Sequence, residues 1–184
     1  MTSSAAAFNA LSRRHDWEQF CDPTLAFDHG DHARVLEIWR AQAGADIPAR
    51  SAMSARLLKP FLPQIGLVER VATDPPRYRW RLLGTGAVQV LGERTGTCFE
   101  DNASPRQAAR WNASASLVLE LRRPLRFVAR VAIEGKEFLA NESLLMPLAD
   151  DDGDTRFVMG YNRYEYGTTW EQAAAQARRA AERG

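Results

Sequence analysis

Glu142 is the residue whose type and position best fit acid–base chemistry. It alternates with Leu144 and Met146 in an apolar run, so the three side chains are expected on one face of a strand. If that face is turned inward, the carboxylate enters a cavity and needs a partner, for which Arg94, Arg130 or a ligand amine are candidates. A register shift of one residue would place Glu142 on the solvent side instead, and both alternatives stay open.

The three histidines all precede the expected sheet, at His15, His29 and His32. His29 and His32 have helical spacing, but a metal site needs further ligands and no partner motif accompanies them. A haem sensor would need a histidine beside its pocket. We therefore interpret these residues as solvated positions near a helix start, and we predict no metal and no cofactor.

Motifs of the common hydrolases are missing from the sequence, which contains no Gly-x-Ser-x-Gly. The acidic run at residues 150–154 lacks the ligand series of an EF-hand loop and is typical of a solvated hairpin turn. No catalytic residue is predicted, and the chain is not expected to be an enzyme.

Charge and length narrow the function classes. The 184 residues fit one domain with flanking segments, and 24 Lys and Arg against 23 Asp and Glu give a net charge of +1. A balance so close to zero argues against nucleic acid or an anionic membrane as the main partner. Neither a signal peptide nor an apolar run of about 18 residues occurs, so we expect a cytoplasmic protein without membrane insertion.

Five helices are expected around these residues. Periodic apolar positions predict helices over 28–43, ending at Gly44, over 54–60 and over 105–122, where Ser104 caps the start. A short helix is expected over 87–91 and ends at Gly92. A fifth helix over 170–183 is opened by two capping-box pairs, Thr168 with Glu171 and Thr169 with Gln172.

Five strands complete the expected fold. Period-2 patterns lie at 65–71, 77–83, 125–131, 137–148 and 157–161. Hairpin links predict one antiparallel sheet, and the helices inserted between its second and third strands can cover only one face. The prediction is an α+β fold with helices on one face and flanking helices at both ends. Its parts are an arm at 1–34, the domain at 35–165 and a C-terminal helix at 166–184.

A cavity between sheet and helices would hold a small apolar or amphipathic ligand. Its aromatic candidates are equally good core residues for a domain this small. The candidate pocket residues are Trp80, Leu82, Trp111, Phe127, Ala129, Glu142, Leu144, Met159 and Tyr161.

The C-terminal helix has two interpretations. Trp170, Ala173 and Ala177 form a narrow stripe that would allow close pairing with a second copy, and Trp39 is a further candidate for a partner surface. Alternatively the helix folds back on its own domain. We predict a homodimer that contacts unidentified signalling proteins.

Several segments resemble one known family. They are residues 62–67 (LPQIGL), 74–85 (DPPRYRWRLLGT), 92–96 (GERTG) and 142–148 (ESLLMPL). Together they are similar to PAS_5, a bacterial family of single PAS domains, over about residues 35–165. The resemblance implies a PAS-like fold and a role in ligand sensing, dimerisation or docking to signalling proteins, with no catalytic motif.

Light-sensing PAS relatives carry a reactive cysteine in an Asn-Cys-Arg-Phe-Leu-Gln motif, but only a cysteine and a phenylalanine match at Cys98 and Phe99. A flavin photosensor is therefore not expected. The sequence favours a sensory or regulatory module without an output domain. The alternatives are an enzyme or carrier that uses Glu142 as acid or base in the cavity, and a pure protein-interaction scaffold with a filled core.

Overall fold

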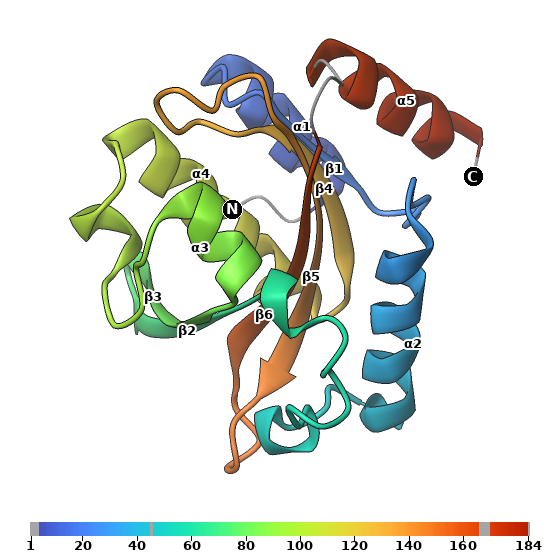
Figure 1. Ribbon diagram of the computed structural model, residues 1–184, viewed down its shortest axis with the longest axis vertical. Helices are drawn as coiled ribbons and strands as arrows, with labels where there is room; N and C mark the ends of the chain where they lie inside the picture. Colours follow the sequence, from blue (N-terminus) through green and yellow to red (C-terminus); the bar gives the residue numbers. More distant parts are fainter. Residues whose placement is uncertain (1–3, 45, 166–169, 184) are drawn as a thin grey trace.

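A six-stranded antiparallel sheet forms the centre of the protein (Figure 1). The computed structural model describes residues 4–44, 46–165 and 170–183. The strand order is β1-β4-β5-β6-β2-β3. The strands are β1 (Gln19–Asp22), β2 (Ile65–Thr73), β3 (Pro76–Leu83), β4 (Leu125–Arg130), β5 (Ala140–Ala149) and β6 (Thr155–Glu165).

The predicted number of five strands is wrong because the N-terminal arm supplies β1. Gln19 pairs with Ala129 and Asp22 with Arg126, so β1 extends the sheet beside β4. Four residues followed by Pro23 are too few to show an alternating pattern, and the strand forms because β4 offers its backbone groups.

Five helices and three short 3-10 turns surround the sheet. The helices are α1 (Ala5–Arg14), α2 (Gly30–Ala43), α3 (Thr85–Leu91), α4 (Pro105–Leu121) and α5 (Trp170–Arg183), and the turns are η1 (Arg50–Ala52), η2 (Leu62–Gln64) and η3 (Phe99–Asp101).

Most of the predicted helices are confirmed. In α4 the Ser104 side chain accepts from the backbone N–H of Gln107, and Gly44 ends α2 with a φ of 55°. The helix expected over 54–60 is wrong, because turns occupy that segment. The capping pairs involve Thr168 and Thr169, which lie outside the described residues.

Helices cover both faces of the sheet, not one as predicted. Figure 1 shows α3 and α4 on one side and α2 and α5 on the other. Along β4, Phe127 packs in the core under α4, whereas Val128 packs against Ala173 and Ala177 of α5. Strands with apolar residues at both odd and even positions need a layer of helices on each face of the sheet. The second layer consists of α2 and α5, which lie outside the segment between β3 and β4.

Packing of α2 and α5 on the sheet covers most of the residues predicted to form a partner surface. Trp39 is buried in the core between α2 and the sheet, and its Nε1–H donates to the carbonyl of Pro147 at 2.9 Å. Ala173 and Ala177 are buried against β4 and β5, with Trp170 packed beside them. The second interpretation of the C-terminal helix is therefore confirmed. Trp39, Ala173 and Ala177 are not free to bind a second copy, whereas Trp170 is only partly buried. The homodimer itself stays a prediction.

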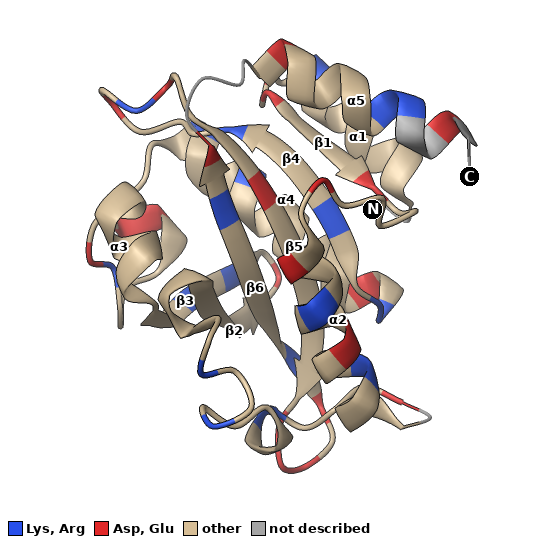
Figure 2. Ribbon diagram, turned by 45° about the vertical axis from the view of Figure 1, so that its right-hand side comes forward, with Lys and Arg blue, Asp and Glu red and all other residues tan. Residues whose placement is uncertain are grey.

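Charges of both signs lie interspersed along the elements, for example on α2 (Figure 2). Among the helices that the structure describes, none combines the length and the apolar character that a bilayer crossing requires.

Candidate functional site

A cavity of about 110 Å³ lies between the sheet and α4. Aromatic rings form its apolar side: Trp80 from β3, Phe127 from β4, Phe99 from η3 and Trp111 from α4. Trp80 and Trp111 meet edge to face with centroids 5.6 Å apart, and Phe99 and Trp111 do so at 5.3 Å. These contacts fix the rings around the cavity, whose volume is of the same order as the roughly 150 Å³ of an apolar cavity that binds benzene.

Two paired glycines keep this space open. Gly66 of β2 lies opposite Gly160 of β6 in the sheet, and both line the cavity. A Cβ atom on Gly160 would lie 2.9 Å from Cδ2 of Leu145. Side chains at this pair would therefore occupy the volume that the aromatic residues enclose.

Polar side chains of α4 form the other side of the cavity. Gln107, Arg110 and Ser114 recur at helical spacing, and all three are buried. Arg110 is only 6% exposed, and its Nη1 donates to the carbonyls of Trp17 and Arg130, each at 3.0 Å. Burial lowers the pKa of Arg110 to about 10.

Several buried N–H groups of the lining residues have no partner within the described chain. They are Nε1 of Trp80, Nε2 of Gln107, Nε of Arg110 and Nε of Arg130. No carboxylate of the described residues lies within 4 Å of the Arg110 guanidinium. Tryptophan and arginine nitrogens can only donate, and so the unpartnered buried side-chain atoms of the described lining residues are all donors.

Arg130 connects the border of the cavity to both ends of the chain. Its Nη1 lies 3.2 Å from the Glu18 carboxylate, just before β1, and its Nη2 donates to Glu171 of α5 at 3.2 Å. The segments before β1 and after β6 therefore both touch a residue that lines the cavity.

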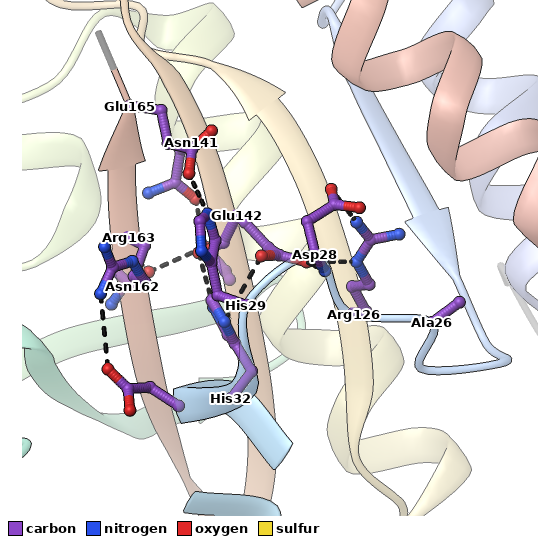
Figure 3. A network of polar contacts seen from close by, with 12 residues as sticks. Ala26, Asp28, His29, His32, Arg126, Asn141, Glu142, Asn162, Arg163 and Glu165 are labelled. Carbon is purple, nitrogen blue, oxygen red and sulfur yellow. Dashed lines mark hydrogen bonds and ion pairs between the residues drawn. The ribbon is translucent and has the colours of Figure 1, made fainter. Parts of the chain in front are cut away.

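A second buried polar cluster lies on the opposite face, centred on Arg126 (Figure 3). This guanidinium is fully buried and donates to three carboxylates: Nε to Glu142 at 2.6 Å, Nη1 to Asp22 at 3.1 Å and Nη2 to Asp28 at 2.7 Å. Three acceptors around one planar donor group satisfy its fork geometry. The cluster therefore fastens the N-terminal segment to β4 and β5.

His32 belongs to this cluster, so its predicted position in solvent is wrong. Its ring stacks on Phe27 and meets Tyr161 edge to face, with centroids 5.2 and 4.9 Å apart. Nε2 lies 3.1 Å from the carbonyl of Glu142 and must donate, because a carbonyl only accepts. Nδ1 then faces the Glu142 carboxylate at 3.4 Å. Burial lowers the pKa of His32 and favours the neutral ring.

The predicted pocket set is divided by the sheet. Four of its members line the cavity: Trp80, Trp111, Phe127 and Ala129. Four others lie on the opposite face: Glu142 beside Arg126, and Leu144, Met159 and Tyr161 in the core under α2. Leu82 is 42% exposed. The prediction of one shared pocket is therefore wrong for the last five.

The expected partners of Glu142 were also wrong. The carboxylate is buried on the face shared with Leu144 and Met146, as alternation predicts, but its partners are Arg126 and the backbone N–H of Asp28. Asp28 lies more than 100 residues earlier in the chain, so local sequence carried no signal of this contact. The polar stripe at 107, 110 and 114 was a usable signal for the cavity wall.

The remaining candidates lie apart from the cavity. Cys98 is half-buried at the start of η3 and is not among the lining residues. In the part of the chain that the structure describes, no group of three His, Cys, Asp or Glu side chains is placed to hold a metal ion.

Comparison with known proteins agrees with the resemblance that the sequence showed. The PAS_5 family, described as a PAS domain, matches residues 27–162. No curated protein matches the chain. Among solved structures, an RNA-binding light-oxygen-voltage receptor is similar over 90% of this chain, with 12% identity and a TM-score of 0.46. The chain spans 42% of the length of that receptor.

Proposed function

This chain belongs to the PAS_5 family of PAS domains, and we propose that it is a sensory module whose cavity takes up a small ligand. Occupancy of the cavity is passed to another protein through the flanking elements α1, β1 and α5. All three lie outside residues 27–162, the part that the family shares.

The observation that carries this proposal is the pair of arginines between cavity and flanks. Arg110 lines the cavity and holds the carbonyl of Trp17, while Arg130 holds Glu18 and Glu171. A ligand that competes for either guanidinium changes the contacts of both ends of the chain. The mechanism is a shift between two populations of flank positions.

The segment held by Arg110 is strained, which suits such a shift. Asp16 and Glu18, on either side of Trp17, have φ values of 50° and 49°. Non-glycine residues in this left-handed region cost of the order of 1 kcal/mol each, and they persist only where surrounding contacts hold them. Loss of the bond between Arg110 and Trp17 would therefore favour release of this segment.

We further propose that the chain has no catalytic activity of its own. Glu142, the acid–base candidate, lies across the sheet from the cavity and is hydrogen-bonded to Arg126. A carboxylate held in this way is a structural acceptor. Output then depends on a partner protein or on a second copy.

Native mass spectrometry of the freshly purified full chain tests the ligand. We expect a reproducible extra mass that disappears on denaturation. Ala129→Val adds two carbons at the cavity wall and should remove this mass. Ala140→Val is the matched control, because Ala140 is equally buried but packs against α5 on the opposite face.

The proposal would be contradicted if every preparation contained only bare protein and the wild-type chain bound no small molecule. That result would favour the scaffold alternative. The same spectra give the mass of the assembly. A monomer at micromolar concentration would contradict the predicted homodimer without affecting the ligand.

A further inference from the structure

We propose that the cavity selects a small organic anion, namely a carboxylate on a single aromatic ring or a short aliphatic chain, over neutral molecules of the same shape. This inference rests on the proposed ligand-sensing function and names the class of ligand. Charge, hydrogen-bond donors, size and access each support it.

The charge of the lining residues is positive. Arg110 and Arg130 are the charged residues among them, and within the described chain no Asp or Glu lines this cavity. Arg130 has two carboxylates as partners, whereas Arg110 has only backbone carbonyls. The Glu18 carboxylate attracts Arg110 from beyond ion-pair distance, while Arg106 repels it. A buried cation without a carboxylate in contact is costly, and an anionic ligand removes that cost.

The unpartnered groups are suited to an anion as well. Nε of Arg110 and Nε1 of Trp80 are buried donors without acceptors among the described residues. A carboxylate offers about four acceptor positions on two oxygens, and hydrogen bonds between charged groups are about twice as strong as neutral ones. A neutral alcohol or hydrocarbon would leave most of these donors unpaired.

Size and shape restrict the body of the ligand. A volume of about 110 Å³ is below the roughly 300–1,000 Å³ of pockets for drug-sized ligands. The apolar lining includes the rings of Trp80, Phe99, Trp111 and Phe127. An apolar body of about six carbons fits such walls, with the carboxylate turned toward α4.

An outer groove provides access to Arg110. This groove of about 310 Å³ shares five lining residues with the cavity: Gln107, Arg110, Arg130, Val131 and Ala132. The charged residues that line the groove only are Glu18, Arg106, Glu134 and Glu137. Arg110 therefore lies where the groove meets the cavity, and a ligand that enters through the groove reaches this cation.

Titration calorimetry of the full chain with benzoate and benzyl alcohol, at 150 mM salt, tests this selectivity. We expect benzoate to bind roughly 10- to 100-fold more tightly than benzyl alcohol, the factor typical of hydrogen bonds to charged groups. Arg110→Met should remove this difference by weakening benzoate alone. Arg40→Met, at an exposed arginine of α2, is the control and should leave both affinities unchanged.

Trp80→Phe is a second variant that keeps an aromatic wall but removes the Nε1 donor together with part of the indole ring. The lost packing affects both probes, so benzoate should be weakened several-fold more than benzyl alcohol, whereas Ala129→Val should weaken both probes. Equal affinities for the two probes, unchanged by Arg110→Met, would overturn the anion selectivity and leave ligand binding in the cavity intact. Binding of neither probe, with no extra mass in native spectra, would overturn the proposed sensing function as well.

Discussion

Two buried arginines lie on opposite faces of the same sheet in opposite electrostatic surroundings. Arg126, on the face of α2 and α5, donates to Asp22, Asp28 and Glu142. Arg110, on the face of α4, is 6% exposed, and its described hydrogen bonds go only to the carbonyls of Trp17 and Arg130. A compensated buried cation indicates structure, whereas an uncompensated one beside a cavity indicates a place for a ligand.

Substituting the compensated arginine should have the largest effect. Arg126→Met leaves two buried carboxylates, Asp22 and Glu142, without their cation. Breaking a buried pair from one side costs about 3–5 kcal/mol. Urea unfolding should show a loss of this size in the free energy of unfolding. A loss below about 1 kcal/mol would contradict the assignment of Arg126 as the structural arginine of the two.

The N-terminal strand should respond next, because Asp22 joins it to Arg126. Cys21 is fully buried on β1, and burial raises the pKa of its thiol to about 12, so it should react very slowly with a thiol reagent. Asp22→Asn removes the charge that holds β1 and should accelerate labelling of Cys21 about tenfold, by the roughly 1–3 kcal/mol of a charged hydrogen bond.

Cys98 is the internal control for this experiment. It is half-buried at η3, away from β1, and should be labelled at the same rate in both proteins. An unchanged rate at Cys21 would show that β1 is held by its pairing with β4 alone and would weaken the role of the Arg126 cluster.

Arg110→Met should change stability much less. The substitution leaves two backbone carbonyls without their donor but also removes a buried cation that has no carboxylate in contact. These two changes in the free energy of unfolding oppose each other. We expect the free energy of unfolding of the ligand-free protein to change by less than about 1 kcal/mol. A loss comparable to that of Arg126→Met would identify Arg110 as a structural residue and contradict its assignment to the ligand.

Features that depend on residues close together in the sequence could be predicted, whereas features that depend on residues far apart in the sequence could not. Local patterns predicted α4 with its Ser104 cap and the end of α2 at Gly44, because caps and periodicity act within a few residues. Alternation also placed Glu142 correctly with Leu144 and Met146 on one face. Within single elements, therefore, local physics was sufficient.

Relations between elements could not be predicted in the same way. Alternation does not say which parity of each strand faces α4, so residues from both faces were combined into one pocket. β1 shows no pattern of its own, and the three partners of Arg126 come from positions 22, 28 and 142. A contact set by the register of distant strands leaves no trace in the sequence around any one of its members.

A pH dependence of stability is predicted on the compensated face. Burial lowers the pKa of His32 below 6.5, although the nearby Glu142 carboxylate opposes the shift and Arg126 and His29 add to it. Below pH 6.5 the unfolded chain therefore takes up a proton before the folded protein does. The contribution of His32 to stability is fully present above pH 6.5 and decreases as the pH falls toward the folded pKa.

His32→Gln separates this term from the rest of the cluster. Glutamine retains an N–H group that can donate to the carbonyl of Glu142 but does not titrate. Burial raises the pKa of Asp28, which acts with the opposite sign in more acidic solution and is common to both proteins. The stability of wild type relative to His32→Gln should therefore fall between pH 7.5 and 5.5, with a slope of at most about 1.4 kcal/mol per pH unit. Parallel stability curves would mean that the pKa of His32 is the same in the folded and unfolded states, so that the Glu142 carboxylate offsets the burial of the ring. That carboxylate would then not be fully compensated by Arg126, which would reduce the contrast with Arg110.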